Sequence, residues 1–95
     1  MATKNIAITV TGQVQQVGFR KSAQEEAVRL GITGTVQNVG SDAVHLEASG
    51  EPDQIDLFVE WCKKGPGKAK IENVEVRKIS QRNFTGFAVI RNRRT

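Results

Sequence analysis

The sequence predicts an α+β domain in which two helices cover one face of a mainly antiparallel sheet. Stretches of alternating apolar residues, typical of half-buried strands, are interspersed with two stretches of helical periodicity. Their order is strand, helix, strand, strand, helix, strand, with a short further strand at the end. At 95 residues the chain has room for one core, so we expect a single domain over residues 1–95.

The first strand is expected over Lys4 to Thr11, where the apolar residues alternate with polar or small ones: Ile6, Ile8 and Val10. A loop with two glycines follows. A helix is then expected from about Lys21 to Leu30, ended by Gly31. Helical spacing predicts that its core-facing residues are Ala23, Ala27 and Leu30.

The second and third strands are expected over Gly34 to Val39 and Ala43 to Ser49. Gly40-Ser41-Asp42 between them is typical of a hairpin turn, and Asp42 tolerates a left-handed backbone better than most residues. In the third strand the alternation places Val44, Leu46 and Ala48 on one face, and His45 and Glu47 on the other.

The second helix is expected to start within Gly50–Asp53 and to run to about Lys64, where Gly65-Pro66-Gly67 stops it. Its apolar stripe is predicted to contain Ile55, Phe58, Val59 and Cys62. A fourth strand is expected from about Lys70 to Ile79. Val74 and Val76 are in step there but Ile71 is out of phase, which leaves the register before Val74 open. The last strand is expected over Gly86 to Arg91, with Phe87 and Val89 on one face.

Two split β-α-β units in this order describe a ferredoxin-like sandwich (βαββαβ plus a short fifth strand). We expect one face of its sheet to pack on both helices. The other face is left to water or to a partner.

Composition restricts the partners without selecting one. The net charge of +4 and the isoelectric point near 9.6 favour anionic partners, either small phosphorylated molecules or nucleic acid. Cys62 is the one cysteine, so no internal disulfide is expected, and its neighbours predict a small buried hydrophobe. The N-terminus has no long apolar run, which predicts neither a signal peptide nor a membrane helix. We therefore expect a cytoplasmic protein with no membrane partner, and a monomer by default.

The loop from Gly12 to Arg20 joins the end of a strand to the start of a helix. Backbone N–H groups can converge there, and the helix dipole adds partial positive charge, which together favour phosphate. Arg20 lies where the loop meets the helix, and its guanidinium can bind two phosphate oxygens at once. A tight connection with a solvated arginine is the alternative interpretation.

The full string of this loop resembles the signature of the acylphosphatase family: Gly12-x-Val14-Gln15-x-Val17-Gly18-Phe19-Arg20. A second pattern similar to that family follows at the expected distance: Leu30-Gly31-Ile32-x-Gly34-x-Val36-x-Asn38, then Val44 and Gly50. The resemblance continues more weakly through Gly65-Pro66 to Phe87, so it covers nearly the whole chain. The family is known for the ferredoxin-like fold.

The resemblance implies hydrolysis of small-molecule acyl phosphates to a carboxylate and inorganic phosphate. It implies that Arg20 and the amides of the loop bind the phosphate, the loop residues being Gln15, Gln16, Val17, Gly18 and Phe19. Asn38 would orient the attacking water. A carboxylate leaves without a proton from a general acid, so positioning and charge stabilisation suffice. No metal or cofactor is expected, because His45 has no cysteine or histidine partner at ligand spacing.

Three residues depart from the family pattern. Gln16 stands where the family usually has glycine, and a positive φ there would cost glutamine about 1–2 kcal/mol. The loop would then hold phosphate less tightly, although the Gln16 side chain could itself donate to the ligand. Thr35 replaces an aromatic residue before Val36, and Asp42 occupies the position of a turn glycine. We expect an active enzyme with reduced or shifted efficiency.

Two alternatives remain. A weakly active or inactive domain of this family could bind phosphorylated ligands or a protein. An RNA-binding module shares the order of strands and helices, and Gly86-Phe87-Ala88-Val89 is faintly similar to part of its aromatic motif. That motif belongs on the third strand, which here carries no aromatic residue, so we expect no nucleic-acid partner.

Overall fold

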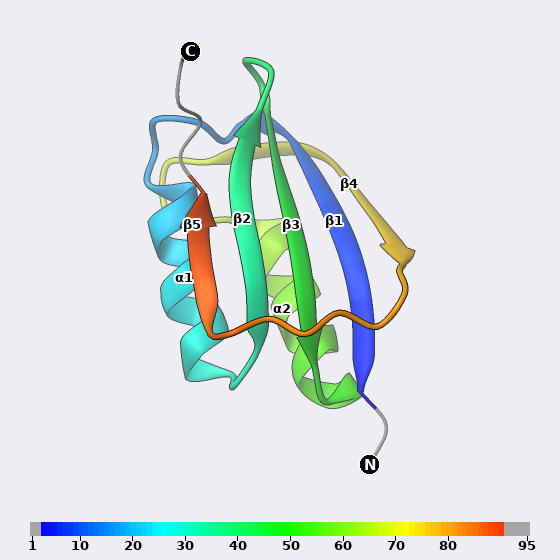
Figure 1. Cartoon of the computed structure of the whole chain (residues 1–95). Helices are drawn as coiled ribbons and strands as arrows, with labels where there is room; N and C mark the ends of the chain where they lie inside the picture. The colour runs from blue at the N-terminus through cyan, green and yellow to red at the C-terminus, as the bar shows by residue number, and fades with distance from the viewer. Residues whose placement is uncertain (1–2, 91–95) are drawn as a thin grey trace.

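The computed structural model describes residues 3–90, which form two helices packed on one face of a five-stranded sheet (Figure 1). In chain order the elements are β1 Lys4–Gln13, α1 Phe19–Arg29, β2 Thr33–Val39, β3 Ala43–Gly50, α2 Pro52–Lys64, β4 Lys70–Lys78 and β5 Phe87–Ile90. The strand order is β4-β1-β3-β2-β5. Only the β2–β5 pair is parallel among these neighbours. The predicted ferredoxin-like sandwich is confirmed.

The loop between β1 and α1 is shorter than the sequence predicts. β1 continues past Thr11 to Gln13, because both added residues remain paired with β4. A Cβ at Gly12 would lie 2.1 Å from the carbonyl oxygen of Lys70, so only glycine lets the two strands approach so closely. α1 begins at Phe19, two residues before the predicted start at Lys21. The loop that remains spans residues 14–18.

The register that the sequence left open in β4 is resolved by a bulge. Thr11 pairs with Asn73 and Gly12 pairs with Ile71, so Glu72 is an extra residue on β4. The extra residue brings Ile71 against the same core as Val74. β4 ends at Lys78, one residue before the predicted end.

The core lies between the helices and the inner face of the sheet. The predicted core residues of α1 are all buried, and so are Ile55, Phe58 and Cys62 of α2. Trp61, which the predicted stripe omits, packs its ring 5.3 Å from Phe19 and 6.2 Å from Phe58. The alternation predicted for β3 is confirmed, since Val44, Leu46 and Ala48 are buried.

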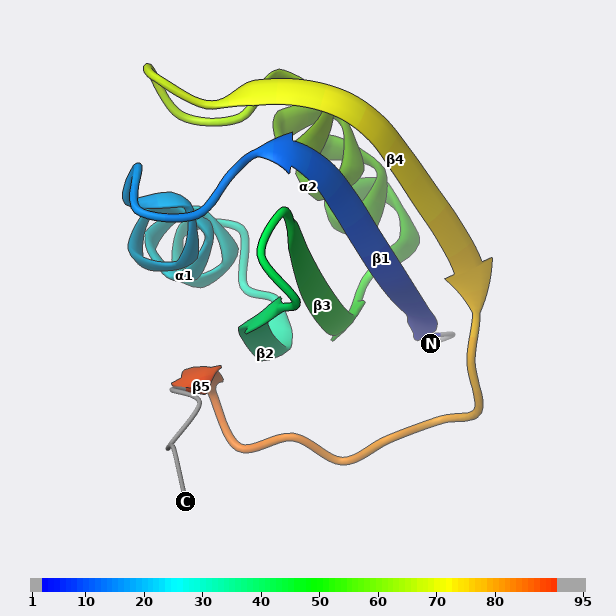
Figure 2. The ribbon, with the colours of Figure 1, turned by 90° about the horizontal axis from the view of Figure 1, so that it is seen from above.

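The outer face of the sheet is crossed by the chain itself. Residues 79–86 run from the end of β4 over this face to β5 (Figures 1 and 2). Arg82 holds this segment in place, because its Nη1 lies 3.0 Å from Glu47 Oε1 and its backbone N donates to Asn5 Oδ1 at 3.5 Å. Gly34 N donates to Gly86 O at 2.9 Å, which aligns β5 beside β2. Arg91, the predicted last residue of β5, lies outside the described residues.

The β2–β3 turn differs from the expectation for Asp42. Gly40 takes the left-handed backbone there, with φ 62°, and Asp42 has no positive φ. Asp42 instead accepts a hydrogen bond from Gly12 N at 2.9 Å through its carbonyl oxygen. Within residues 3–90, no helix is long and apolar enough to cross a membrane.

Candidate active site

The N-terminus of α1 is open toward the loop. Gly18 precedes the helix with φ 78° and ψ 16°, a left-handed conformation that glycine adopts without strain. No side chain caps the first turn, and no acidic residue lies in it. The first N–H groups of a helix have no partner within the helix, so here they are available to an anion.

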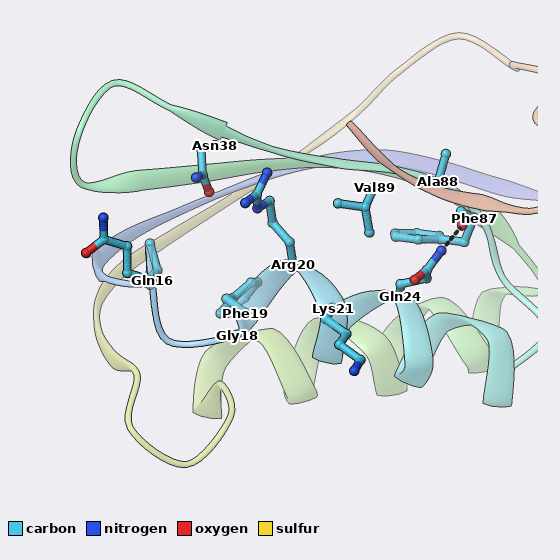
Figure 3. A pocket seen from close by; sticks show the side chains of 11 residues that line it. Gln16, Gly18, Phe19, Arg20, Lys21, Gln24, Asn38, Phe87, Ala88 and Val89 are labelled. Atoms are coloured by element: carbon cyan, nitrogen blue, oxygen red, sulfur yellow. Dashed lines mark hydrogen bonds between the residues drawn. The ribbon is translucent and has the colours of Figure 1, made fainter. Parts of the chain in front are cut away.

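Gln16 occupies a strained position in the same loop. Its φ is 61°, and it is the only non-glycine residue between 3 and 90 with a positive φ. The positive φ considered for this position from the sequence is therefore confirmed. Its side chain is exposed and points away from the Arg20 guanidinium (Figure 3).

A pocket of about 770 Å³ lies between this loop, α1, the end of β2, and β5. Arg20 and Asn38 both line it, and their side chains point toward one another (Figure 3). Arg20 is the second residue of α1, and Asn38 is the last residue but one of β2. The lining residues are Val14, Gln16, Gly18, Phe19, Arg20, Lys21, Gln24, Asn38, Phe87, Ala88 and Val89. Two of them are cations and none is a carboxylate, so the pocket favours anions.

Gln15 and Val17 are not among the residues that line this pocket. Gln15 Nε2 donates to the carbonyl oxygens of Val39, Gly40 and Ala43, at 3.4, 3.1 and 2.9 Å. The Gln15 side chain thus ties the loop to the turn that directly follows Asn38. Val17 packs against the core. Both side chains therefore hold the loop in position rather than face a ligand in the pocket.

Phe19 fixes the start of the helix. Its ring is buried, with 1% exposed, against Trp61 of α2. Because Arg20 follows directly, this anchor sets where the guanidinium can reach. Arg20 Nη1 lies 3.4 Å from the carbonyl oxygen of Ile90, at the end of β5.

His45 lies on the outer face of the sheet, away from this pocket. Its Nδ1 is 3.3 Å from Thr9 Oγ1, and its Nε2 is 3.5 Å from Glu47 Oε2. In the part of the chain that the structure describes, no three histidine, cysteine or acidic residues cluster as metal ligands would.

The sequence did not identify the second half of the pocket. Lys21 and Gln24 come from α1, and Phe87, Ala88 and Val89 come from β5. A signal existed for Gln24, which lies four residues after Arg20 and so on the same helix face. No local pattern could place β5 beside α1.

Comparison with known proteins identifies the family. The acylphosphatase family model matches residues 6–89. The chain belongs to the acylphosphatase family. It is 38% identical over 90 residues to the acylphosphatase of Methylococcus capsulatus, covering 94% of this chain and 98% of that protein. It is 40% identical over 84 residues to the acylphosphatase of a Nocardioides species, covering 88% and 85% of the two.

Solved acylphosphatase structures share the fold closely. That of Coxiella burnetii has a TM-score of 0.90 at 38% identity and covers 93% of each chain. That of Bacillus subtilis has a TM-score of 0.88 at 30% identity, covering 94% of this chain and 99% of its own. The family resemblance predicted from the sequence is therefore confirmed.

Proposed function

We propose that this protein is an acylphosphatase that hydrolyses the carboxyl–phosphate bond of acyl phosphates to a carboxylate and inorganic phosphate, without a metal or cofactor. The observation that carries the proposal is the pocket in which the uncapped start of α1, Arg20 and Asn38 meet. Membership in the acylphosphatase family supports it.

The phosphoryl group binds at the start of α1. Amides of the loop from Gln15 to Phe19 donate to its oxygens, and the Arg20 guanidinium binds two of them side by side. These donors are fixed by the fold, so they need no reorganisation as charge spreads over the phosphoryl oxygens in the transition state.

Asn38 orients a water in line with the bond that breaks. The water oxygen bonds to phosphorus while the bond from phosphorus to the acyl oxygen breaks. The carboxylate leaves with the bonding electron pair, and the proton of the water passes to solvent or to the product phosphate. Because the carboxylate is a good leaving group, positioning and electrostatic stabilisation supply the catalysis.

The test is steady-state hydrolysis of benzoyl phosphate with a chelator present. We expect Arg20→Ala and Asn38→Ala each to lower kcat/KM by about 10²–10³, as loss of one transition-state donor does. Arg29→Ala, at the other end of α1, and Gln37→Ala, next to Asn38 on β2, are the matched controls and should keep wild-type activity.

Turnover in the wild type that both active-site variants retain would overturn the assigned roles. A folded wild type that binds phosphate without turning over any acyl phosphate would favour the alternative of a binding domain. RNA binding has little support, because β3 carries no phenylalanine, tyrosine or tryptophan and residues 79–86 cross the face that RNA would need. The cytoplasmic location and monomeric state stay predictions from the sequence.

A further inference from the structure

The pocket extends well beyond the atoms that would hold a phosphoryl group. Its volume of about 770 Å³ lies within the range of roughly 300–1,000 Å³ that small-molecule sites occupy. The part beyond Arg20 is a groove between α1 and β5, lined by Gln24 on one side and by Phe87 and Val89 on the other (Figure 3). We call this part the α1–β5 groove.

The α1–β5 groove is lined by two apolar side chains and one amide. Val89 is partly buried and packs on the core, and Phe87 is 6% exposed. Gln24 Nε2 donates to the Phe87 carbonyl oxygen at 2.9 Å, so this amide group already has a partner on β5. The second lining cation, Lys21, is exposed, and its side chain points away from Arg20 (Figure 3). The groove therefore offers apolar contact rather than a second charge.

The direction of the reaction places the leaving group in this groove. In-line displacement puts the attacking water and the leaving oxygen on opposite sides of phosphorus. Figure 3 shows Arg20 between Asn38 and Val89, and Arg20 also contacts the residue after Val89 through the Ile90 carbonyl oxygen. With phosphorus beside the Arg20 guanidinium and the water on the Asn38 side, the acyl group lies on the side where the same pocket continues toward β5.

We propose that the α1–β5 groove binds the acyl group of the substrate, and that Val89 sets a preference for acyl phosphates with an apolar aryl or branched acyl group. This inference rests on the proposed function, since it assigns the other half of the same substrate. Val89 acts by contact with the substrate, and Gln24 acts as a positioning residue that holds β5 at its distance from α1.

The experiment uses two inert analogues, so that binding is measured without turnover. In phenacylphosphonate and acetonylphosphonate, a CH₂ group replaces the bridging oxygen of benzoyl and acetyl phosphate. Each ligand is titrated into the protein by NMR. We expect both to shift the amides of residues 16–20, and only phenacylphosphonate to shift Val89 and the Gln24 side-chain amide.

Variants then test which residue sets the preference. We expect the wild type to bind phenacylphosphonate more tightly than acetonylphosphonate. Val89→Ala removes two methyl groups and should reduce that ratio of Kd values about three- to tenfold, less than the roughly tenfold or more that one methylene is worth in an enclosed apolar pocket, because Val89 is only partly buried. Val89→Phe should occlude the groove and weaken phenacylphosphonate alone. Val74→Ala, a partly buried valine outside the pocket, should leave the ratio unchanged.

The outcomes separate this inference from the proposed function. Identical Kd ratios in the wild type and both Val89 variants would refute the proposal that the α1–β5 groove binds the acyl group. A folded wild type that binds neither phosphonate would refute it as well. If the Kd ratio depends on Val89 but the protein hydrolyses no acyl phosphate, the acyl-binding role of the groove would be supported and the proposed acylphosphatase activity refuted. If the protein hydrolyses benzoyl phosphate but the Kd ratio does not depend on Val89, the proposed activity would be supported and the acyl-binding role of the groove refuted.

Discussion

Replacement of Gln16 by glycine is predicted to stabilise the protein. Gln16 holds a φ of 61°, a left-handed conformation that costs a non-glycine residue about 1–2 kcal/mol. Glycine removes that cost, but it adds conformational freedom to the unfolded chain, which costs about 0.4–1 kcal/mol. The exposed Gln16 side chain gives up little packing when it is removed.

The two terms differ by about 0.5–1 kcal/mol in favour of Gln16→Gly. In a domain of this size, that difference corresponds to a rise in Tm of about 2–8 °C. Relaxed loop amides should also bind phosphate more tightly, so the KM for benzoyl phosphate should fall.

Urea and thermal unfolding measure the change in stability, with two controls that separate strain from chain entropy. Gln16→Ala removes the side chain but keeps the strained φ, so it should not stabilise. Gln81→Gly makes the same exchange at an exposed position without a positive φ, and should lower the free energy of unfolding by about 0.5–1 kcal/mol. If Gln16→Gly destabilises as much as Gln81→Gly, the left-handed backbone carries no cost and the reasoning fails.

Two further predictions concern the hydrogen bonds made by the Gln15 side chain and the buried thiol of Cys62. Gln15→Leu removes the hydrogen bonds from its amide to three carbonyl oxygens and should lower the free energy of unfolding by about 0.5–1.5 kcal/mol. It should also lower kcat, because the turn beside Asn38 loses this tie to the loop. Urea unfolding and benzoyl phosphate hydrolysis check the prediction, and unchanged values in both would contradict it. Burial raises the pKa of the Cys62 thiol, so above about pH 8.5 the unfolded chain loses a proton that the folded protein keeps. The free energy of unfolding should therefore fall by about 1.4 kcal/mol per pH unit above that point. Urea unfolding at pH 8–10 should show this decrease in the wild type but not in Cys62→Ala. Equal pH slopes in the two proteins would refute the prediction.

Local patterns predicted most of the fold. The alternation in β3 and the helical spacing of Ala23 and Ala27 depend only on neighbouring residues, so they could be read without the structure. The failures involve contacts between distant segments. β1 extends to Gln13 because the bulge at Glu72 keeps it paired with β4, and no pattern within β1 contains that information.

Part of the candidate site could likewise be predicted from local sequence and part could not. Arg20 and Asn38 followed from motif strings that are continuous in sequence, and the structure places both in one pocket. The β5 side of the pocket could not be predicted from the motifs, because β5 reaches its place beside β2 only after the chain has crossed the sheet. Gln15 was predicted to bind phosphate through its loop amide, and the bonds of its side chain to the turn after Asn38 could not be predicted, because that turn is distant in sequence.

The segment of residues 79–86 has a consequence for how activity arises during folding. The start of α1 and the end of β2 lie within the first 40 residues, but the groove wall is the last strand described and reaches its place only after the chain has crossed the sheet. Pairing β5 with β2 closes a loop that contains β3, α2 and β4. Closing this loop has an entropic cost that precedes the favourable contacts of β5. If β5 docks last, a refolding chain should recover phosphate binding before it recovers discrimination between acyl groups, whereas two-state folding would recover both together. The time lag between the two would measure the docking of the final strand.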